Sequence, residues 1–270
     1  DCPEETVTPV WVDVEEEVEV DFQYSAGDLC SITEDVWVSP DGDDYLNTGI
    51  SASNAFLTIE TALALIAPDS LNAITINLTA GTFSPSTTGE NFPIVMVSNV
   101  NLIGQGEEVT ILDAEGNVDN QRRVITMEGC ENNIISNITI TGGYADYSGG
   151  GMYLFSSNPT ITHVIINSNI AGDTSYCQGA KGGGMYLEQS NPYLTNVTIT
   201  NNYTDGAGGM YLEQSNPYLT NVKISWNSAL CDQGGGIFLQ YSDPTIVNVN
   251  IISNTSQHGG GGIWLFYSIP

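Results

Sequence analysis

Residues 182–202 read GGGMYLEQSNPYLTNVTITNN, and residues 207–227 repeat them closely as AGGMYLEQSNPYLTNVKISWN. Weaker copies of this unit lie on both sides of the pair. The apolar residue that follows the glycines recurs after 33, 25, 27 and 26 residues, at Met152, Met185, Met210, Ile237 and Ile263. A unit of this length cannot bury its own apolar face, but stacked copies bury a continuous one. The repeat therefore predicts a solenoid.

Within one unit, apolar and polar residues alternate. Met185 and Leu187 flank Tyr186, and a second alternating run follows the Asn191-Pro192 corner. Short runs with a period of two, bounded by Gly, Asn and Pro, favour strands over helix. The sequence predicts an all-β fold, a right-handed parallel β-helix. A leucine-rich repeat has a similar length, but it needs a stricter leucine framework and a helical return segment.

Equivalent residues of adjacent coils stack about 4.8 Å apart, so identical residues form ladders. Asparagine suits such ladders because its amide bonds to neighbouring turns and because it tolerates left-handed backbone. One predicted ladder comprises Asn169, Asn202, Asn227 and Asn254, and a second, begun by His163, comprises Asn196, Asn221 and Asn248. Both ladders are interpreted as structural.

The chain is predicted to divide into an acidic N-terminal strand segment, 1–35, and a β-helix, 36–270. The β-helix comprises an N-terminal cap with the first coils, 36–116, and regular coils, 117–270. A short helix that begins after Thr58 is expected to cover the open end of the solenoid. A strand over residues 10–22 is predicted, apolar on one face and acidic on the other, and it is expected either to pack along the β-helix or to pair with another subunit.

Composition limits the partners. The 32 acids against 4 bases give a net charge of -28, which repels nucleic acid and anionic membranes. Hydrophobic residues make up 41% and charged residues only 13%, so the chain is expected to fold. It contains no apolar run of 18 or more residues, so no membrane insertion is expected.

The five cysteines lack metal-binding spacing, which favours disulfides and an oxidising compartment. We expect Cys177 to pair with Cys231, because the long loop around Cys177 can reach across a shorter one. Cys2 then pairs with Cys30, and Cys130 stays free. The predicted location is extracellular or at the cell surface.

The stretch WVSPDGDDYLNTG and its continuation to residue 116 resemble the N-terminal part of secreted proteins in the pectate-lyase-like β-helix superfamily. The GGGMYL and SNPYLTNVTITNN units resemble repeats of bacterial surface proteins, including the polymorphic outer-membrane type. This resemblance implies a β-helix, in a superfamily that includes lyases, esterases, hydrolases and adhesins. The Asp cluster of pectate lyases, the Gln-Asp pair of pectin esterases and the Asn-Thr-Asp motif of polygalacturonases are not found here.

The sequence thus favours a non-catalytic role: binding of a glycan or other surface polymer, as an adhesin or structural surface component. Two alternatives stay open, namely a Ca²⁺-dependent polysaccharide lyase or glycoside hydrolase, and a filament subunit that stacks end to end. The exposed last strand, 263–267, is expected to support self-association through the ends of the β-helix. Because the protein is strongly acidic, a neutral glycan or a cation-bridged polymer is the easier ligand.

Aromatic residues supply the candidate glycan contacts. One outward row is expected to stack along an exposed face, where flat rings can hold sugars. This row comprises Tyr153, Tyr186, Tyr211, Phe238 and Trp264. Tyr193 and Tyr218 form a second, shorter row. Glu188 and Glu213 follow the first row as a pair of surface carboxylates.

Ca²⁺ is the one cofactor that the sequence suggests. Asp41, Asp43, Asp44 and Asn47 form an oxygen-rich loop of the type that Ca²⁺ prefers, although their spacing does not match an EF-hand. The Glu188 and Glu213 pair is the second candidate site for the ion.

Overall fold

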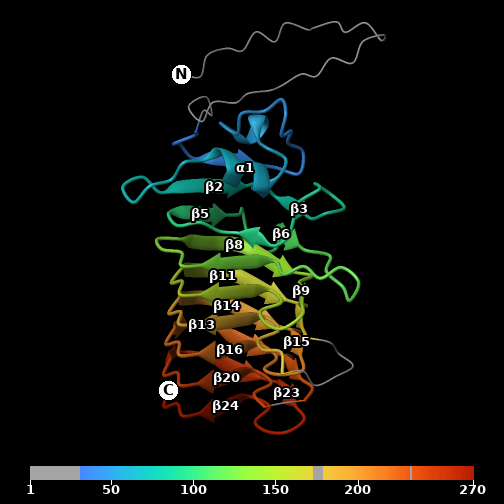
Figure 1. Ribbon diagram of the computed structural model, residues 1–270, viewed down its shortest axis with the longest axis vertical. Helices are drawn as coiled ribbons and strands as arrows, with labels where there is room; N and C mark the ends of the chain where they lie inside the picture. The colour runs from blue at the N-terminus through green and yellow to red at the C-terminus, as the bar shows by residue number, and fades with distance from the viewer. Residues whose placement is uncertain (1–30, 173–178, 232) are drawn as a thin grey trace, which may run out of the picture.

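The structure is a computed structural model that describes residues 31–172, 179–231 and 233–270. These residues form a stack of parallel coils that runs from α1 at one end to β24 at the other (Figure 1). The predicted right-handed parallel β-helix is confirmed. Residues 1–30 lie outside the described part, so the prediction for the N-terminal strand segment and its boundary at residue 35 stays untested.

The strands of the described residues form three parallel sheets. The largest has twelve strands: β1 (Val36–Val38), β2 (Ile74–Leu78), β3 (Gly81–Phe83), β5 (Val100–Ile103), β6 (Thr110–Asp113), β8 (Ile134–Thr141), β11 (Thr160–Asn167), β14 (Tyr193–Thr200), β17 (Tyr218–Thr220), β18 (Lys223–Ser225), β21 (Thr245–Val247) and β22 (Asn250–Ile252).

The second sheet has seven strands: β4 (Ile94–Val95), β7 (Ile125–Glu128), β10 (Met152–Phe155), β13 (Met185–Glu188), β16 (Met210–Glu213), β20 (Ile237–Gln240) and β24 (Ile263–Phe266). The third has five: β9 (Tyr144–Ala145), β12 (Ile170–Ala171), β15 (Tyr203–Thr204), β19 (Ser228–Ala229) and β23 (Thr255–Ser256). In the seven-stranded sheet, Met152, Met185, Met210, Ile237 and Ile263 pair in register, as the repeat predicts.

The core is one continuous cluster inside the coils. Met185, Leu187 and Leu194 are fully buried, and the polar residues between them point outward or into turns. Alternation therefore places the apolar residues correctly along each strand. At the C-terminal end, Leu265 and Phe266 in β24 are exposed, so the last coil presents apolar side chains.

The first asparagine ladder lies inside the solenoid. Asn202 Oδ1 accepts from the backbone N–H and the side-chain amide of Asn169, both at 3.0 Å, and Asn227 binds Asn202 in the same way. Asn254 continues the ladder. Each amide thus satisfies backbone groups at a buried turn, where an unpaired polar group is costly. This prediction is confirmed.

A serine ladder, buried except in the last coil, lies at another corner, directly after β10, β13, β16, β20 and β24 of the seven-stranded sheet. It comprises Ser157, Ser190, Ser215, Ser242 and Ser268, each hydroxyl accepting the backbone N–H of the residue before it in the ladder. Cys130 occupies the first position and donates its N–H to Ser157 Oγ at 2.9 Å. Its thiol is free and buried, which agrees with the cysteine prediction.

The second asparagine ladder lies on the outside. His163, Asn196, Asn221 and Asn248 have φ between 52° and 56° and join through side-chain hydrogen bonds of 2.6–3.2 Å. Their left-handed backbone bends the long strands of the twelve-stranded sheet, and asparagine accepts this conformation more readily than most residues. The prediction of this ladder is confirmed as well.

The N-terminal cap contains α1 (Ile59–Leu65) and the 3-10 turn η1 (Ala52–Asn54). Thr58 precedes α1 and its hydroxyl accepts from the Thr61 N–H, as an N-cap should. Ile59 and Ala62 bury one side of the helix at the end of the solenoid (Figure 1). The predicted capping helix is confirmed.

Candidate functional site

The long aromatic row is present, but loops cover it. Ring centroids lie 5.5 Å apart for Tyr153 and Tyr186, and 4.7 Å apart for Tyr211 and Phe238. Yet Tyr186 and Tyr211 are only 5% exposed, and Phe238 only 8%. The expectation of an exposed platform is therefore wrong for these three rings, whereas Tyr153 and Trp264 at the ends are partly buried.

The covering comes from segments that precede the strands of the seven-stranded sheet. Ala207 is buried among the rings, and Lys181 Nζ lies 4.7 Å from the Tyr211 ring centroid. Arg123 covers Tyr153 in the same way, at 4.6 Å. The alternation correctly predicts that these rings point away from the main core. The loops then cover the rings from outside, so the rings form a second small core.

Glu188 and Glu213, expected as surface carboxylates, are partly buried, and Lys181 of a covering loop contacts Glu213. Glu213 Oε2 lies 2.7 Å from Lys181 Nζ and 2.8 Å from the Tyr186 hydroxyl, which is 3.1 Å from Glu188 Oε2. Partial burial favours a higher pKa for Glu213, but the hydrogen bonds from Lys181 and Tyr186 outweigh it, so its pKa is lowered. Burial and the two carboxylates raise the pKa of Tyr186. The phenol therefore stays protonated and joins the two carboxylates, whereas Lys181 connects Glu213 to the covering loop.

The acidic loop of the cap uses its carboxylates for backbone hydrogen bonds. Asp43 Oδ1 accepts from the N–H groups of Tyr45 and Leu46, and Asp44 Oδ1 accepts from Leu57 at 2.7 Å. Asn47 donates to Ala55 O at 2.8 Å. In the described ranges, no three or more His, Cys, Asp or Glu side chains group to hold a metal ion. Ca²⁺ binding by this loop, which includes Asp41, stays a prediction.

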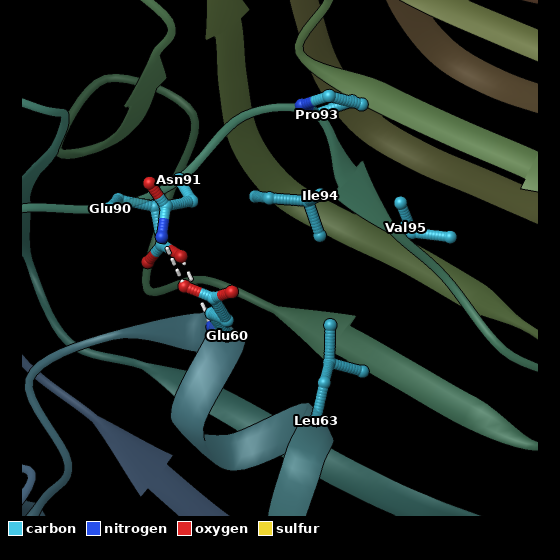
Figure 2. Close-up of a pocket in the computed structure, with 7 residues that line it drawn as sticks. All are labelled: Glu60, Leu63, Glu90, Asn91, Pro93, Ile94 and Val95. Carbon is cyan, nitrogen blue, oxygen red and sulfur yellow. Dashed lines mark hydrogen bonds between the residues drawn. The ribbon is translucent and has the colours of Figure 1, made fainter.

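A pocket of about 170 Å³ lies beside α1. Figure 2 shows Glu60, Glu90 and Asn91 together at one end of it, and apolar side chains along the rest of the wall. Glu90 is 1% exposed and accepts from the N–H groups of Ile59, at 2.7 Å, and Glu60, at 3.1 Å. Burial raises the pKa of Glu90 to about 7, although both backbone hydrogen bonds oppose the shift. This carboxyl fastens the cap helix to the first coils.

Tyr193 and Tyr218 form the exposed aromatic pair. They face each other across β14 and β17 with ring centroids 4.7 Å apart and planes 7° apart. Tyr193 is 51% exposed and Tyr218 is 45% exposed. Their predicted stacking is thus confirmed, and unlike the long row they are open to solvent.

A shallow groove lies further along the outer face of the twelve-stranded sheet and begins at Asn221, three residues after Tyr218. Tyr218, Thr220, Asn221 and Lys223 point outward along one stretch of chain, while Leu219, Val222 and Ile224 between them are buried. The groove has a volume of about 390 Å³ and is lined by Asn221, Val222, Lys223, Asn248, Val249 and Asn250. No carboxylate lines it, in a protein of net charge -28.

The ladder amides that line the groove keep unused hydrogen-bonding capacity. Asn221 Nδ2 donates to Asn196 Oδ1, and Asn221 Oδ1 accepts from Asn248 Nδ2. A side-chain amide has two donor hydrogens and two acceptor lone pairs. These two bonds therefore leave one donor hydrogen and one acceptor lone pair of Asn221 unused. Lys223 and Asn250 add further polar groups that sequence reasoning missed, although their outward position follows from the alternation.

One family model matches most of the chain. The family model described as "Protein of unknown function (DUF1565)" matches residues 41–265. The chain belongs to this family. A search of curated proteins finds no match.

Solved structures share the fold. The chain is similar to pectin methylesterase PemA from Erwinia chrysanthemi, at 11% identity over 85% of this chain and 71% of that chain, with a TM-score of 0.52. Pectate lyase Pel9A is 11% identical over 88% of this chain and 78% of that chain, with a TM-score of 0.43. The likeness to the pectin methylesterase shows that this chain shares its parallel β-helix fold, which is the fold that the resemblance implied.

Two further sequence predictions concern the disulfides and the absence of a membrane span. Cys2, Cys30 and Cys177 lie outside the described residues, so both predicted disulfides, including that of Cys177 with Cys231, stay predictions. Among the residues described, no helix has the length and apolar character needed to cross a membrane.

Proposed function

We propose that this protein is a secreted or cell-surface glycan-binding protein, and that it binds sugar at the Tyr193 and Tyr218 pair and the adjoining groove. The observation that carries the proposal is an exposed, parallel tyrosine stack next to a groove lined by amides. The two rings cover each other's inner faces, so a sugar can contact the outer faces and the exposed edges of the stack, while the amides donate to and accept from its hydroxyl groups. The solved neighbours include a pectin methylesterase and a pectate lyase, whose names connect this fold with polysaccharides.

Charge favours a neutral glycan. A net charge of -28 repels a polyanion at long range, whereas the groove itself has amides and the single ammonium of Lys223. A neutral sugar meets no such repulsion. Its hydroxyls match the amides of Asn221, Asn248 and Asn250 in both donor and acceptor roles.

The test is a pull-down on insoluble neutral polysaccharides: cellulose, xylan, mannan, chitin and curdlan. We expect the parent protein to be retained on at least one of them, and Tyr193→Ala/Tyr218→Ala to lose at least ten-fold in affinity. Tyr147→Ala is the matched control, because Tyr147 is also exposed, at 67%, but lies in the loop after β9. Retention on none of the polysaccharides, or equal retention of the double variant and the parent, would contradict the proposal.

A further inference from the structure

A second exposed tyrosine pair lies at the corner where each coil leaves the seven-stranded sheet. Tyr241 and Tyr267 have parallel rings with centroids 5.2 Å apart, and they are 50% and 74% exposed. Phe266, 43% exposed, meets both rings edge to face, at 5.8 and 4.5 Å. Ile263 and Leu265 of the same last coil are exposed as well, so the distinctive feature here is the stacked tyrosine pair at one corner.

These two tyrosines adopt a backbone conformation that bulky side chains seldom take. Tyr241 and Tyr267 have φ of 49° and 50°, and they continue a turn column in which Gln189 and Gln214 both have φ of 50°. The column is joined by backbone hydrogen bonds from one coil to the next. Gln fills the same turn elsewhere, so the fold does not require tyrosine there. Left-handed backbone carries a steric cost for such a residue, and neither ring is buried in return.

The second pair adjoins the first. Tyr193 follows Gln189 by four residues and Tyr218 follows Gln214 by four, so the turn column and the strand starts flank the same corner of the solenoid. In the next coil the strand start is Thr245, which pairs with Tyr218, and the tyrosine has moved to the turn, as Tyr241. Four consecutive coils therefore each present one exposed tyrosine at this corner.

We propose that these four tyrosines form one binding track for an unbranched glycan chain that lies along the solenoid axis. This inference rests on the proposed function and specifies its ligand as a linear polymer. Coils are spaced about 4.8 Å apart, so three steps span about 14 Å, which is longer than one sugar ring. Strand β17 lies between β14 and β21, so Tyr218 stacks on Tyr193 on one side and neighbours Thr245 on the other, in the coil that also holds Tyr241.

The test compares ligand lengths. Oligosaccharides of two to six units are prepared from the polysaccharide that retains the parent protein, and their affinities are measured by titration calorimetry. The variant is Tyr241→Gln/Tyr267→Gln, because glutamine already occupies this turn at Gln189 and Gln214 with the same φ. It is compared with Tyr193→Ala/Tyr218→Ala, and melting curves establish that each variant is folded.

We expect affinity in the parent protein to rise with chain length. The Tyr241→Gln/Tyr267→Gln variant should bind the disaccharide like the parent but bind the hexasaccharide at least ten-fold more weakly. The Tyr193→Ala/Tyr218→Ala variant should weaken binding of both. Affinity that does not rise beyond the disaccharide, or hexasaccharide binding unchanged by the glutamine variant, would overturn the track. A Tyr193→Ala/Tyr218→Ala variant that binds like the parent would instead overturn the proposed function.

Discussion

The Lys181 ammonium lies 2.7 Å from the Glu213 carboxylate, and this ion pair joins a loop to a strand 32 residues further along the chain. The same ammonium lies over the Tyr211 ring, which the loop helps to bury. Lys181 therefore covers the outward side chains in two ways: it pairs with the Glu213 carboxylate and it lies over the Tyr211 ring. It explains how a row of outward rings becomes a small core.

Lys181→Met should destabilise the protein by about 1–2 kcal/mol, because it leaves Glu213 without its cation in a half-buried site. In the native state the pKa of Glu213 is lowered, so its contribution is present at neutral pH and is lost as pH falls through that lowered pKa. In Lys181→Met, the free energy of unfolding should depend less on pH in this range. Urea unfolding of Lys181→Met, Glu213→Gln and the double variant measures the coupling, with exposed Lys223→Met as control. Additive effects would contradict the assignment.

Asn202→Ala should cost at least about 3 kcal/mol, because several buried partners lose a hydrogen bond at once. Asn202 Nδ2 donates to Ile166 O and Asn227 Oδ1, both at 3.0 Å, and its Oδ1 accepts twice from Asn169. Asn196 is the control from the exposed ladder. Asn196→Ala should cost about 1 kcal/mol through its left-handed backbone, and Asn196→Gly less. Equal losses for Asn202→Ala and Asn196→Ala in urea unfolding would count against the interior role.

Glu90 should make the stability of the cap fall as pH rises. Its pKa is about 7 in the folded protein against an ordinary 4.5, so the folded state holds the proton more tightly. Its contribution is full below about pH 4.5 and is lost as pH approaches 7, by about 3 kcal/mol. Glu60 and Asp44 are the nearby acids that oppose ionisation.

Other carboxylates also titrate, so the comparison is with Glu90→Gln. The stability of the parent relative to this variant should rise when pH is lowered from 7 to 4.5, as measured by urea unfolding at each pH. A difference that does not depend on pH would show that Glu90 ionises normally.

Tyr211 and Tyr218 form a matched pair, seven residues apart, with opposite expected effects. Tyr211→Ala should cost about 3 kcal/mol, because the ring is 5% exposed and packs on Phe238. Tyr218→Ala should cost about 1 kcal/mol or less, since that ring is half exposed. When retention on the polysaccharide is corrected for the fraction of protein that is folded, only Tyr218→Ala should weaken it. A reversed pattern in melting and pull-down measurements would restore the long row as the binding platform.

Asp44→Ala should cost about 2–3 kcal/mol, since its carboxylate accepts from the N–H groups of Leu57 and Thr58 and from the Thr58 hydroxyl. This loss should be the same in excess chelator and in millimolar Ca²⁺ if the loop is purely structural. A melting temperature that rises with Ca²⁺ in the parent, but not in Asp44→Ala, would instead support the calcium prediction by mass action.

Much of the fold could be read from the sequence, because in a solenoid the neighbour of each residue is its equivalent in the next repeat. The spacing from Met185 to Met210 therefore already specifies a strand pair, and Asn202 and Asn227 specify a ladder. The exposed stack of Tyr193 and Tyr218 follows from the same rule. The alternation within each strand determines which side chains enter the core.

What only the tertiary structure decided is which outward side chains stay uncovered. Tyr211 and Tyr218 both leave the core according to the pattern, but a loop containing Lys181 lies over the first and solvent over the second. Glu90 and the start of α1 likewise meet across 31 residues without a repeat to relate them. The physical reason is that periodicity fixes the direction of a side chain relative to its own strand, whereas burial depends on the path of loops that obey no period.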